Sequence, residues 1–202
     1  ENNLYLINFK TLTMKKLIFT FILASSLLSC SSDDDNSNNN NQLNVDGSNF
    51  TITDAKAVDN FRFFSETHAE YNFVLASAPI TIDADPGSYF GYETDNAKIS
   101  LNLSIAALGD VFQNGVYQYN ENLGFEEPNF NFFDAFEIYI DNNQNGSYFD
   151  SGDNILFATS GTVTVSGTAP NYVLNFDVEL SNGQNFEYTY NQGFDYVDNR
   201  AN

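Results

Sequence analysis

The chain has 202 residues, of which 7 are basic and 27 acidic, so its formal net charge is −20. No basic cluster is present to meet phosphates, which excludes nucleic-acid binding. The single cysteine, Cys30, cannot form an intramolecular disulfide or a cysteine-based zinc site. The single histidine, His68, stands in a polar stretch without a nucleophile motif, and we interpret it as a residue of a surface loop.

The first thirty residues predict a processing segment. Residues 1–13 precede the only methionine, Met14, and we interpret them as an upstream extension outside the fold. Residues 14–29 begin with two lysines and continue as an apolar run shorter than the ~18 residues needed to span a bilayer, which is typical of a signal peptide. Its ending, Leu27-Leu28-Ser29-Cys30, resembles that of bacterial lipoproteins. The resemblance implies that Cys30 becomes the lipidated mature N-terminus.

Residues 30–42 are interpreted as a flexible tether, because Ser, Asp and Asn bury too little apolar area to offset the cost of ordering. Removing the residues before Cys30 leaves four basic and 26 acidic residues, a net charge of −22. An anionic membrane would repel this chain, so the expected membrane link is the lipid. The run Asp33-Asp34-Asp35 resembles the export signal of surface lipoproteins in Bacteroidetes, which implies an outer-membrane and cell-surface location. The alternative is a solvated spacer.

Residues 43–198 predict a single all-β domain, an antiparallel sandwich or barrel. The dipeptide Asp46-Gly47 is a hairpin signal. Beyond it, apolar and polar residues alternate with period two, which indicates half-buried strands. The positions expected to face the core are Tyr71, Phe73, Leu75, Ile99, Leu101, Leu103, Ile105, Phe136, Ile138, Ile140, Leu174, Phe176, Val178, Phe186, Tyr188 and Tyr190. We expect a monomer.

Two stretches of this domain predict shorter elements. Val163 and Val165 predict a short strand after Gly161, separate from a strand that starts near Ile155. Residues 104–111 predict at most one short turn of helix.

The segment 141–153, DNNQNGSYFDSGD, is the best candidate for a metal site. Oxygen ligands at alternate positions followed by Gly146 reproduce the first half of a calcium loop, and calcium takes 6–8 oxygens. The segment resembles the DxNxNG loops of extracellular calcium-binding repeats, but the later acids stand one residue beyond the usual positions. The expected ligands are Asp141, Asn143, Asn145, and Asp150 or Asp153. The alternative is a polar connection between strands.

Two further kinds of site are weighed against simple packing. Carboxylate pairs such as Asp83 with Asp85 could serve glycoside hydrolysis, whereas Glu126 and Glu127 would point to opposite faces of a strand. The aromatic residues Tyr89, Phe90, Tyr92, Tyr117 and Tyr119 could stack on sugar rings, but the chain lacks Trp, and we favour packing in the core or within a strand as their role.

The C-terminal part, with its GTVTVS strand, long alternating strand, Asn182-Gly183 turn and final aromatic strand, resembles small uncharacterised lipoproteins of flavobacterial type. The resemblance covers both ends of the chain and supports an all-β envelope lipoprotein. We therefore predict a non-catalytic binding or structural module, stabilised by Ca²⁺, that contacts a glycan or an envelope protein. The alternative function is a carboxylate-based carbohydrate-active enzyme.

Overall fold

The computed structural model describes residues 41–61, 66–84, 90–121 and 128–200. The predicted extension, signal peptide and lipidation site Cys30 lie outside these residues, as does the tether except for its last two positions. Within the described ranges no helix is long and apolar enough to cross a bilayer.

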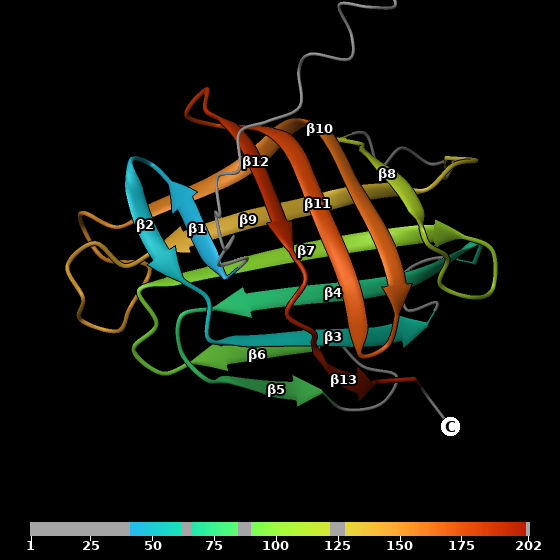
Figure 1. The fold of residues 1–202 in the computed structure, drawn as a ribbon, viewed down its shortest axis with the longest axis horizontal. Helices are drawn as coiled ribbons and strands as arrows, with labels where there is room; N and C mark the ends of the chain where they lie inside the picture. The colour runs from blue at the N-terminus through green and yellow to red at the C-terminus, as the bar shows by residue number, and fades with distance from the viewer. Residues whose placement is uncertain (1–40, 62–65, 85–89, 122–127, 201–202) are drawn as a thin grey trace, which may run out of the picture. The chain divides into compact units, whose positions relative to one another are not determined.

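The described chain is all-β, as predicted, and contains thirteen strands (Figure 1). The strands are β1 Gln42–Val45, β2 Ser48–Thr51, β3 Asp54–Phe61, β4 His68–Ala76, β5 Ile80–Ala84, β6 Phe90–Thr94, β7 Ile99–Leu108, β8 Gly115–Tyr119, β9 Phe132–Ile140, β10 Asn154–Thr168, β11 Asn171–Leu180, β12 Asn185–Tyr190 and β13 Asp195–Asp198.

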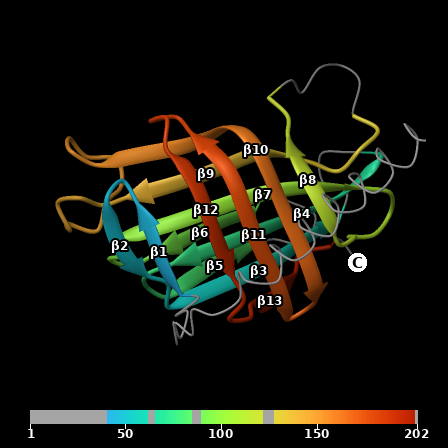
Figure 2. The same cartoon turned by 45° about the horizontal axis from the view of Figure 1, so that its top comes forward.

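Nine strands form one curled sheet in the order β12-β11-β10-β8-β9-β7-β4-β3-β13. Its front layer, β10 to β12, crosses over the layer formed by β9, β7, β4 and β3 (Figures 1 and 2). The sheet is mixed rather than purely antiparallel, because β13 pairs with β3 and β8 pairs with β9 in parallel. The remaining pairings are antiparallel, as the alternation predicted.

The core lies between the two layers. Phe136 of β9 packs against Phe176 of β11 at a ring-centroid distance of 5.4 Å, and Phe73 of β4 meets Tyr172 of β11 at 5.5 Å. All the alternating positions expected to face inward are buried except Tyr188, which is half-buried against the core. Period two therefore identified the inner face of each long strand correctly.

Strand β10 corrects the prediction of separate short strands. Its 15 residues run without interruption from Asn154 to Thr168 and include Gly161. The first part pairs with β9 and the second with β8 and β11, with an irregularity in register between Ala158 and Ser160. A bulge bends a strand, so β10 passes from the rear layer to the front. Residues 104–108 likewise continue β7 instead of forming a helical turn.

Two hairpins complete the domain. In the first, β1 and β2 join through Asp46 and Gly47, which both have positive φ, as the turn signal predicted. The second, β5 with β6, packs on the outer face of the sheet, where Ile80 joins a small cluster with Val74, Ala76 and Ala97.

Candidate functional site

Loop 141–153 connects β9 to β10 and turns around a buried carboxylate. Asp141 is only 4% exposed. Its Oδ1 and Oδ2 accept the backbone N–H groups of Asn145 at 3.3 Å and Gly146 at 2.8 Å. Gln144 and Gly146 have positive φ, which folds the chain back over the carboxylate. The turn predicted from the DxNxNG spacing is therefore present.

The other predicted ligands in the first part of the loop lie on the same side as Asp141. Asn143 Oδ1 accepts the same Asn145 N–H, at 3.0 Å, so its oxygen is near that of Asp141. Asn145 Nδ2 donates to Asp150 Oδ2 at 2.5 Å. These hydrogen bonds bring together the side chains of Asp141, Asn143, Asn145 and Asp150.

Asp153 has a different position. Its two carboxylate oxygens accept the backbone N–H groups of Asn142 at 3.1 Å and Asp150 at 3.0 Å, so the side chain closes the base of the loop. Asn142 Nδ2 adds a bond to the Gly152 carbonyl at 2.8 Å. Of the two alternatives for the last ligand, the geometry favours Asp150.

The donor set fits a hard cation held largely by neutral oxygens. In the described part of the chain, no group of three or more His, Cys, Asp or Glu side chains is arranged to hold a metal ion. A cation in the loop would therefore depend on amide and carbonyl oxygens beside Asp141 and Asp150. Calcium accepts such ligands, whereas zinc prefers nitrogen and sulfur.

Beside the loop, aromatic side chains surround a hollow of about 460 Å³, which we call the aromatic hollow. Its lining consists of Tyr92, Glu93, Thr94, Asp95, Tyr139, Gly146, Ser147, Tyr148 and Phe149. The ring of Tyr139 lies 5.8 Å from that of Tyr148 and 6.0 Å from that of Phe149. The Tyr148 hydroxyl meets Thr94 Oγ1 at 3.0 Å, which links the loop to β6.

At the other end of the sheet, a pocket of about 410 Å³ is built around Asp59, and we call it the Asp59 pocket. Asp59 on β3 is 6% exposed. Tyr71 of β4 and Tyr196 of β13 both donate to its Oδ2, at 2.7 and 3.0 Å, and Arg200 Nε lies 3.6 Å from that oxygen. One carboxylate therefore joins β3, β4 and β13.

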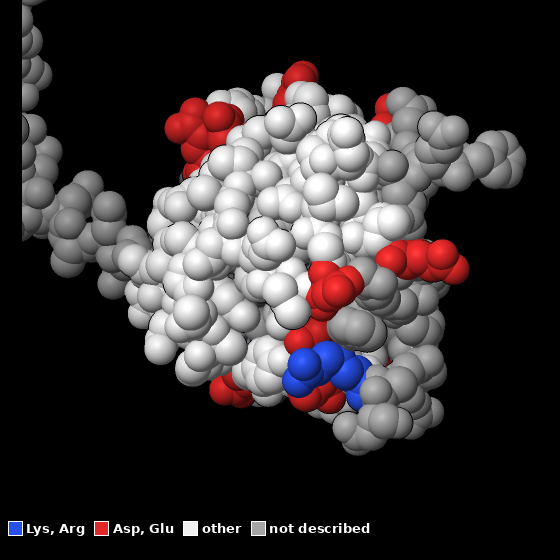
Figure 3. All heavy atoms as spheres, turned by 90° about the vertical axis from the view of Figure 1, so that its right-hand side faces the viewer, with Lys and Arg blue, Asp and Glu red and all other residues white. Residues whose placement is uncertain are grey.

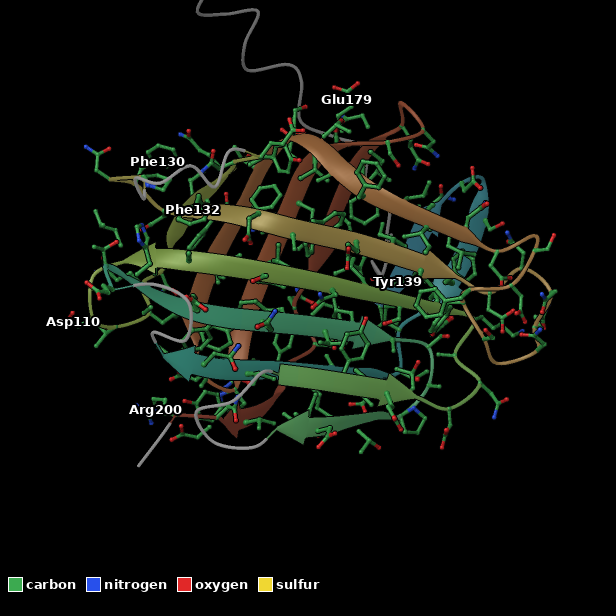
Figure 4. All side chains as sticks on the ribbon, turned by 180° about the vertical axis from the view of Figure 1, so that it is seen from behind. Asp110, Phe130, Phe132, Tyr139, Glu179 and Arg200 are labelled. Atoms are coloured by element: carbon green, nitrogen blue, oxygen red, sulfur yellow. The ribbon has the colours of Figure 1, made fainter. Side chains whose placement is uncertain are left out.

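The walls of the Asp59 pocket are aromatic. Phe112 lies 4.2 Å from the ring of Tyr71 and 5.5 Å from that of Tyr172. Asp110, Asn114, Gly167 and Thr168 contribute to the rim. Asp110 and Arg200 lie at the end of the sheet opposite Tyr139 (Figure 4). Figure 3 views this end, where a single small basic area is flanked by acidic side chains.

The tyrosine hydroxyl groups of the Asp59 pocket stay protonated and can donate hydrogen bonds. Burial, followed by the hydrogen bond to Asp59, raises the pKa of Tyr71 and of Tyr196 above the ordinary value. At the rim, hydrogen bonds from Arg200 lower the pKa of Asp198 to about 2. Both tyrosines are therefore neutral and Asp198 is charged at neutral pH.

The interpretation of His68 as a surface residue is wrong. The side chain is fully buried at the start of β4. Its Nδ1 contacts Thr67 Oγ1 at 2.7 Å, its Nε2 contacts the Phe130 carbonyl at 3.2 Å, and its ring meets Phe132 edge-on at 5.0 Å. The polar neighbours in sequence hid a core position, because a strand's first residue takes its face from the sheet rather than from adjacent residues.

The other sequence candidates separate clearly. Tyr117 is fully buried and Tyr119 packs against the core, which confirms packing as their role. Tyr92 lines the aromatic hollow. Asp83 is exposed on β5. The remaining candidates, Tyr89, Asp85, Glu126, Glu127 and the side chain of Phe90, lie outside the described residues.

The fold and the two sites define an all-β domain with a curled mixed sheet, a polar turn at one end and a tyrosine-lined pocket at the other. Comparison of the chain with models of known families, with curated proteins and with solved structures gives no match.

Proposed function

We propose that this protein is an outer-membrane lipoprotein, anchored by lipid at Cys30, whose β domain is a non-catalytic binding module stabilised by calcium. The proposed anchor rests on the two lysines, the apolar run and the Leu-Leu-Ser-Cys ending of the leader. One acyl chain binds a membrane only weakly, so stable attachment requires the several chains of a bacterial lipoprotein.

The observation that carries the calcium proposal is the turn around Asp141. Its carboxylate fixes the Asn145 and Gly146 N–H groups, while the side chains of Asn143 and Asp150 are gathered beside it. Asp141 and Asp150 are the only charged members of this set, because Asp153 closes the base. So few charges predict weak binding, with a Kd of about 10⁻⁴–10⁻³ M, as in extracellular modules.

Calcium that binds only the folded protein raises its stability by RT ln(1 + [L]/Kd). We therefore expect a rise in melting temperature at millimolar calcium that magnesium at matched ionic strength does not reproduce. The rise is lost in Asp141→Ala. Asp177→Ala, which removes one carboxylate from the outer face of β11, is the control for net charge and keeps the rise. If magnesium raises the melting temperature as much as calcium does, or if the rise persists in Asp141→Ala, the loop is a polar turn and not a calcium site.

The anchor has its own test. We expect mass spectrometry of the mature protein to show a modified Cys30 at its N-terminus, and Cys30→Ala to leave the membrane fraction. An unmodified N-terminus would remove the lipoprotein assignment while leaving the calcium measurement unaffected.

The second candidate function is a carboxylate-based carbohydrate-active enzyme, and one observation favours it. Asp59 and Asp110 both line the Asp59 pocket, together with Phe112 and Tyr172. A pair of carboxyl groups in one pocket is the arrangement that glycoside hydrolysis uses. Release of reducing sugar from oligosaccharides by the native protein, abolished in Asp110→Asn, would establish this function in place of the first.

A further inference from the structure

The aromatic hollow exposes apolar surface that the fold does not use. Phe149 is 78% exposed, although burying a phenylalanine is one of the larger favourable terms in folding. It contacts Tyr139, and on the neighbouring strand Ile155 lies directly opposite Tyr139 and is 42% exposed. Exposed apolar side chains that adjoin one another mark binding surfaces more often than single ones do.

Hydrogen bonds anchor the three tyrosine rings of the aromatic hollow. Tyr139 donates to Glu137 at 2.6 Å, Tyr148 is joined to Thr94, and the Tyr92 hydroxyl accepts from Ser100 at 3.2 Å. The residues before Phe149 belong to the turn around Asp141. The three tyrosines are therefore prearranged beside Phe149, which lowers the free-energy cost of ordering the surface when a ligand binds.

The arrangement of the rings differs from that of a site for a small cation. A site for a quaternary ammonium encloses the cation between several aromatic faces. Here Tyr139 contacts both Tyr148 and Phe149 directly, at centroid distances within the normal range for packed pairs. The plane of Tyr139 is inclined by 47° to that of Tyr148 and by 67° to that of Phe149, so the rings pack against one another as neighbours rather than enclosing a cation as a cage.

The rim of the hollow selects against anions. None of its nine lining residues is Lys or Arg, and Glu93 and Asp95 place two carboxylates beside the rings. Carboxylates accept hydrogen bonds from hydroxyl groups and repel sulfates, phosphates and uronic acids. The volume of about 460 Å³ lies within the range of small-ligand sites.

We propose that the aromatic hollow binds a neutral saccharide. The C–H face of a sugar ring lies on the exposed ring of Phe149, beside Tyr139, and its hydroxyl groups donate to Glu93 and Asp95. This inference rests on the proposed function as a binding module and adds the class of ligand and its place. Because Phe149 continues the loop that encloses Asp141, calcium in that loop strengthens saccharide binding by holding the Phe149 ring in place.

The test uses the full-length protein in a detergent without a sugar headgroup, on an array of neutral and anionic glycans that also carries a choline conjugate. We expect neutral oligosaccharides to bind, followed by titration calorimetry of the best one with calcium present. Phe149→Ala weakens that binding at least tenfold with an unchanged melting temperature. Phe130→Ala, which removes a 41% exposed ring at the opposite end of the sheet, leaves it unchanged.

Four outcomes would overturn the inference. They are an array without neutral ligands, preferential binding of anionic glycans or of choline, unchanged affinity in Phe149→Ala, and loss of affinity in Phe130→Ala instead. The calcium-specific melting shift is measured without any glycan. If the calcium-specific shift is present but no saccharide binds, only this inference is rejected. If the shift is absent, the calcium proposal is rejected separately.

Discussion

The hydrogen bonds that close loop 141–153 on itself join residues no more than 11 positions apart, whereas Asp59 and Tyr196 in the Asp59 pocket are separated by 137. The turn around Asp141 is built by a local sequence, and the Phe149 ring that follows it projects into solvent. The pocket end is built by three distant strands that meet at one carboxylate. A local motif is thus visible in sequence before the fold is known, and a carboxylate shared by distant strands is visible only afterwards.

Strand β10 connects the two ends, because it begins at the loop and its last residues, Gly167 and Thr168, line the Asp59 pocket. The comparison predicts that changes in this shared strand or in the core damage both ends. Changes at either site alone should remain confined to it.

The largest effect is expected from Gly161→Ala. Gly161 has φ +114°, and a Cβ there would lie 2.3 Å from the backbone oxygen of Asp177, so β10 and β11 would have to separate. We expect a loss of about 5 kcal/mol or more in the free energy of unfolding, or failure to fold. Gly183→Ala is the control, since its φ of +81° carries only the left-handed strain of ~1–2 kcal/mol and no atom lies within 4 Å. Similar losses in both variants would show that the close approach at β10 is unimportant.

Next in size is truncation of the core aromatic under the pocket. Phe73 is fully buried and contacts the rings of Tyr71, Phe112, Tyr172 and Phe194. Phe73→Ala should cost ~3–5 kcal/mol in urea unfolding. Phe149→Ala at the loop end should stay within ~0.5 kcal/mol, because that ring is exposed. Comparable losses would mean that the loop end is part of the core.

A smaller effect is expected from the carboxylate that joins three strands. Asp59→Ala leaves the hydroxyls of Tyr71 and Tyr196 without their acceptor, and hydrogen bonds to charged groups contribute ~1.5–3 kcal/mol. We expect a loss of about 2–3 kcal/mol in denaturant unfolding. Asp195 is 77% exposed and its partner Lys56 keeps a second ion pair with Asp54, so Asp195→Ala should cost less than ~1 kcal/mol. If the two variants lose the same free energy of unfolding, the hydrogen bonds to Asp59 do not stabilise the fold.

The smallest effect is a loss of stability in alkali, which is absent at neutral pH. Burial raises the pKa of the Tyr71, Tyr172 and Tyr196 hydroxyls at the pocket end, and it raises that of Tyr190 to about 12. A folded-state pKa above the unfolded value of about 10 means that stability is complete below pH 10 and is lost as pH rises toward the folded-state values. We expect denaturant midpoints to be level from pH 7 to 9 and to fall from about pH 10 to 12. A constant midpoint across that window would show that these hydroxyls ionise freely in the folded protein.

Alternation predicted the long strands well because each of them has one face in the core. Leu103 of β7 and Leu174 of β11 are fully buried, and their polar neighbours alternate with them as expected. The continuity of β10 could not be predicted in the same way. Gly161 and the Ser and Thr residues around it are typical of a turn, and only the close approach of β11 explains why they form a strand.

The two sites also differ in how far the sequence predicts them. Spacing alone predicts the calcium ligands of loop 141–153, and the turn around Asp141 that would gather them is present. The Asp59 pocket was missed entirely, since Asp59, Tyr71 and Tyr196 share no local pattern. The parallel pairing of β13 with β3 creates that site, and sequence alternation carries no information on which distant strands become neighbours.

The parallel pairing of β13 with β3 also determines when the domain can be completed during synthesis. Lys56 of β3 bonds Asp195 of β13 at 2.6 Å, and the Asn199 N–H bonds the Asp59 carbonyl at 2.9 Å. The outer edge of β3 therefore stays uncovered until nearly the whole domain has been translated. Until then this edge has unpaired backbone groups, which are a template for association with other chains. A chain that stops before Asp195 would keep the alternating core strands and still expose a permanent edge, so it is expected to aggregate rather than to fold with lower stability.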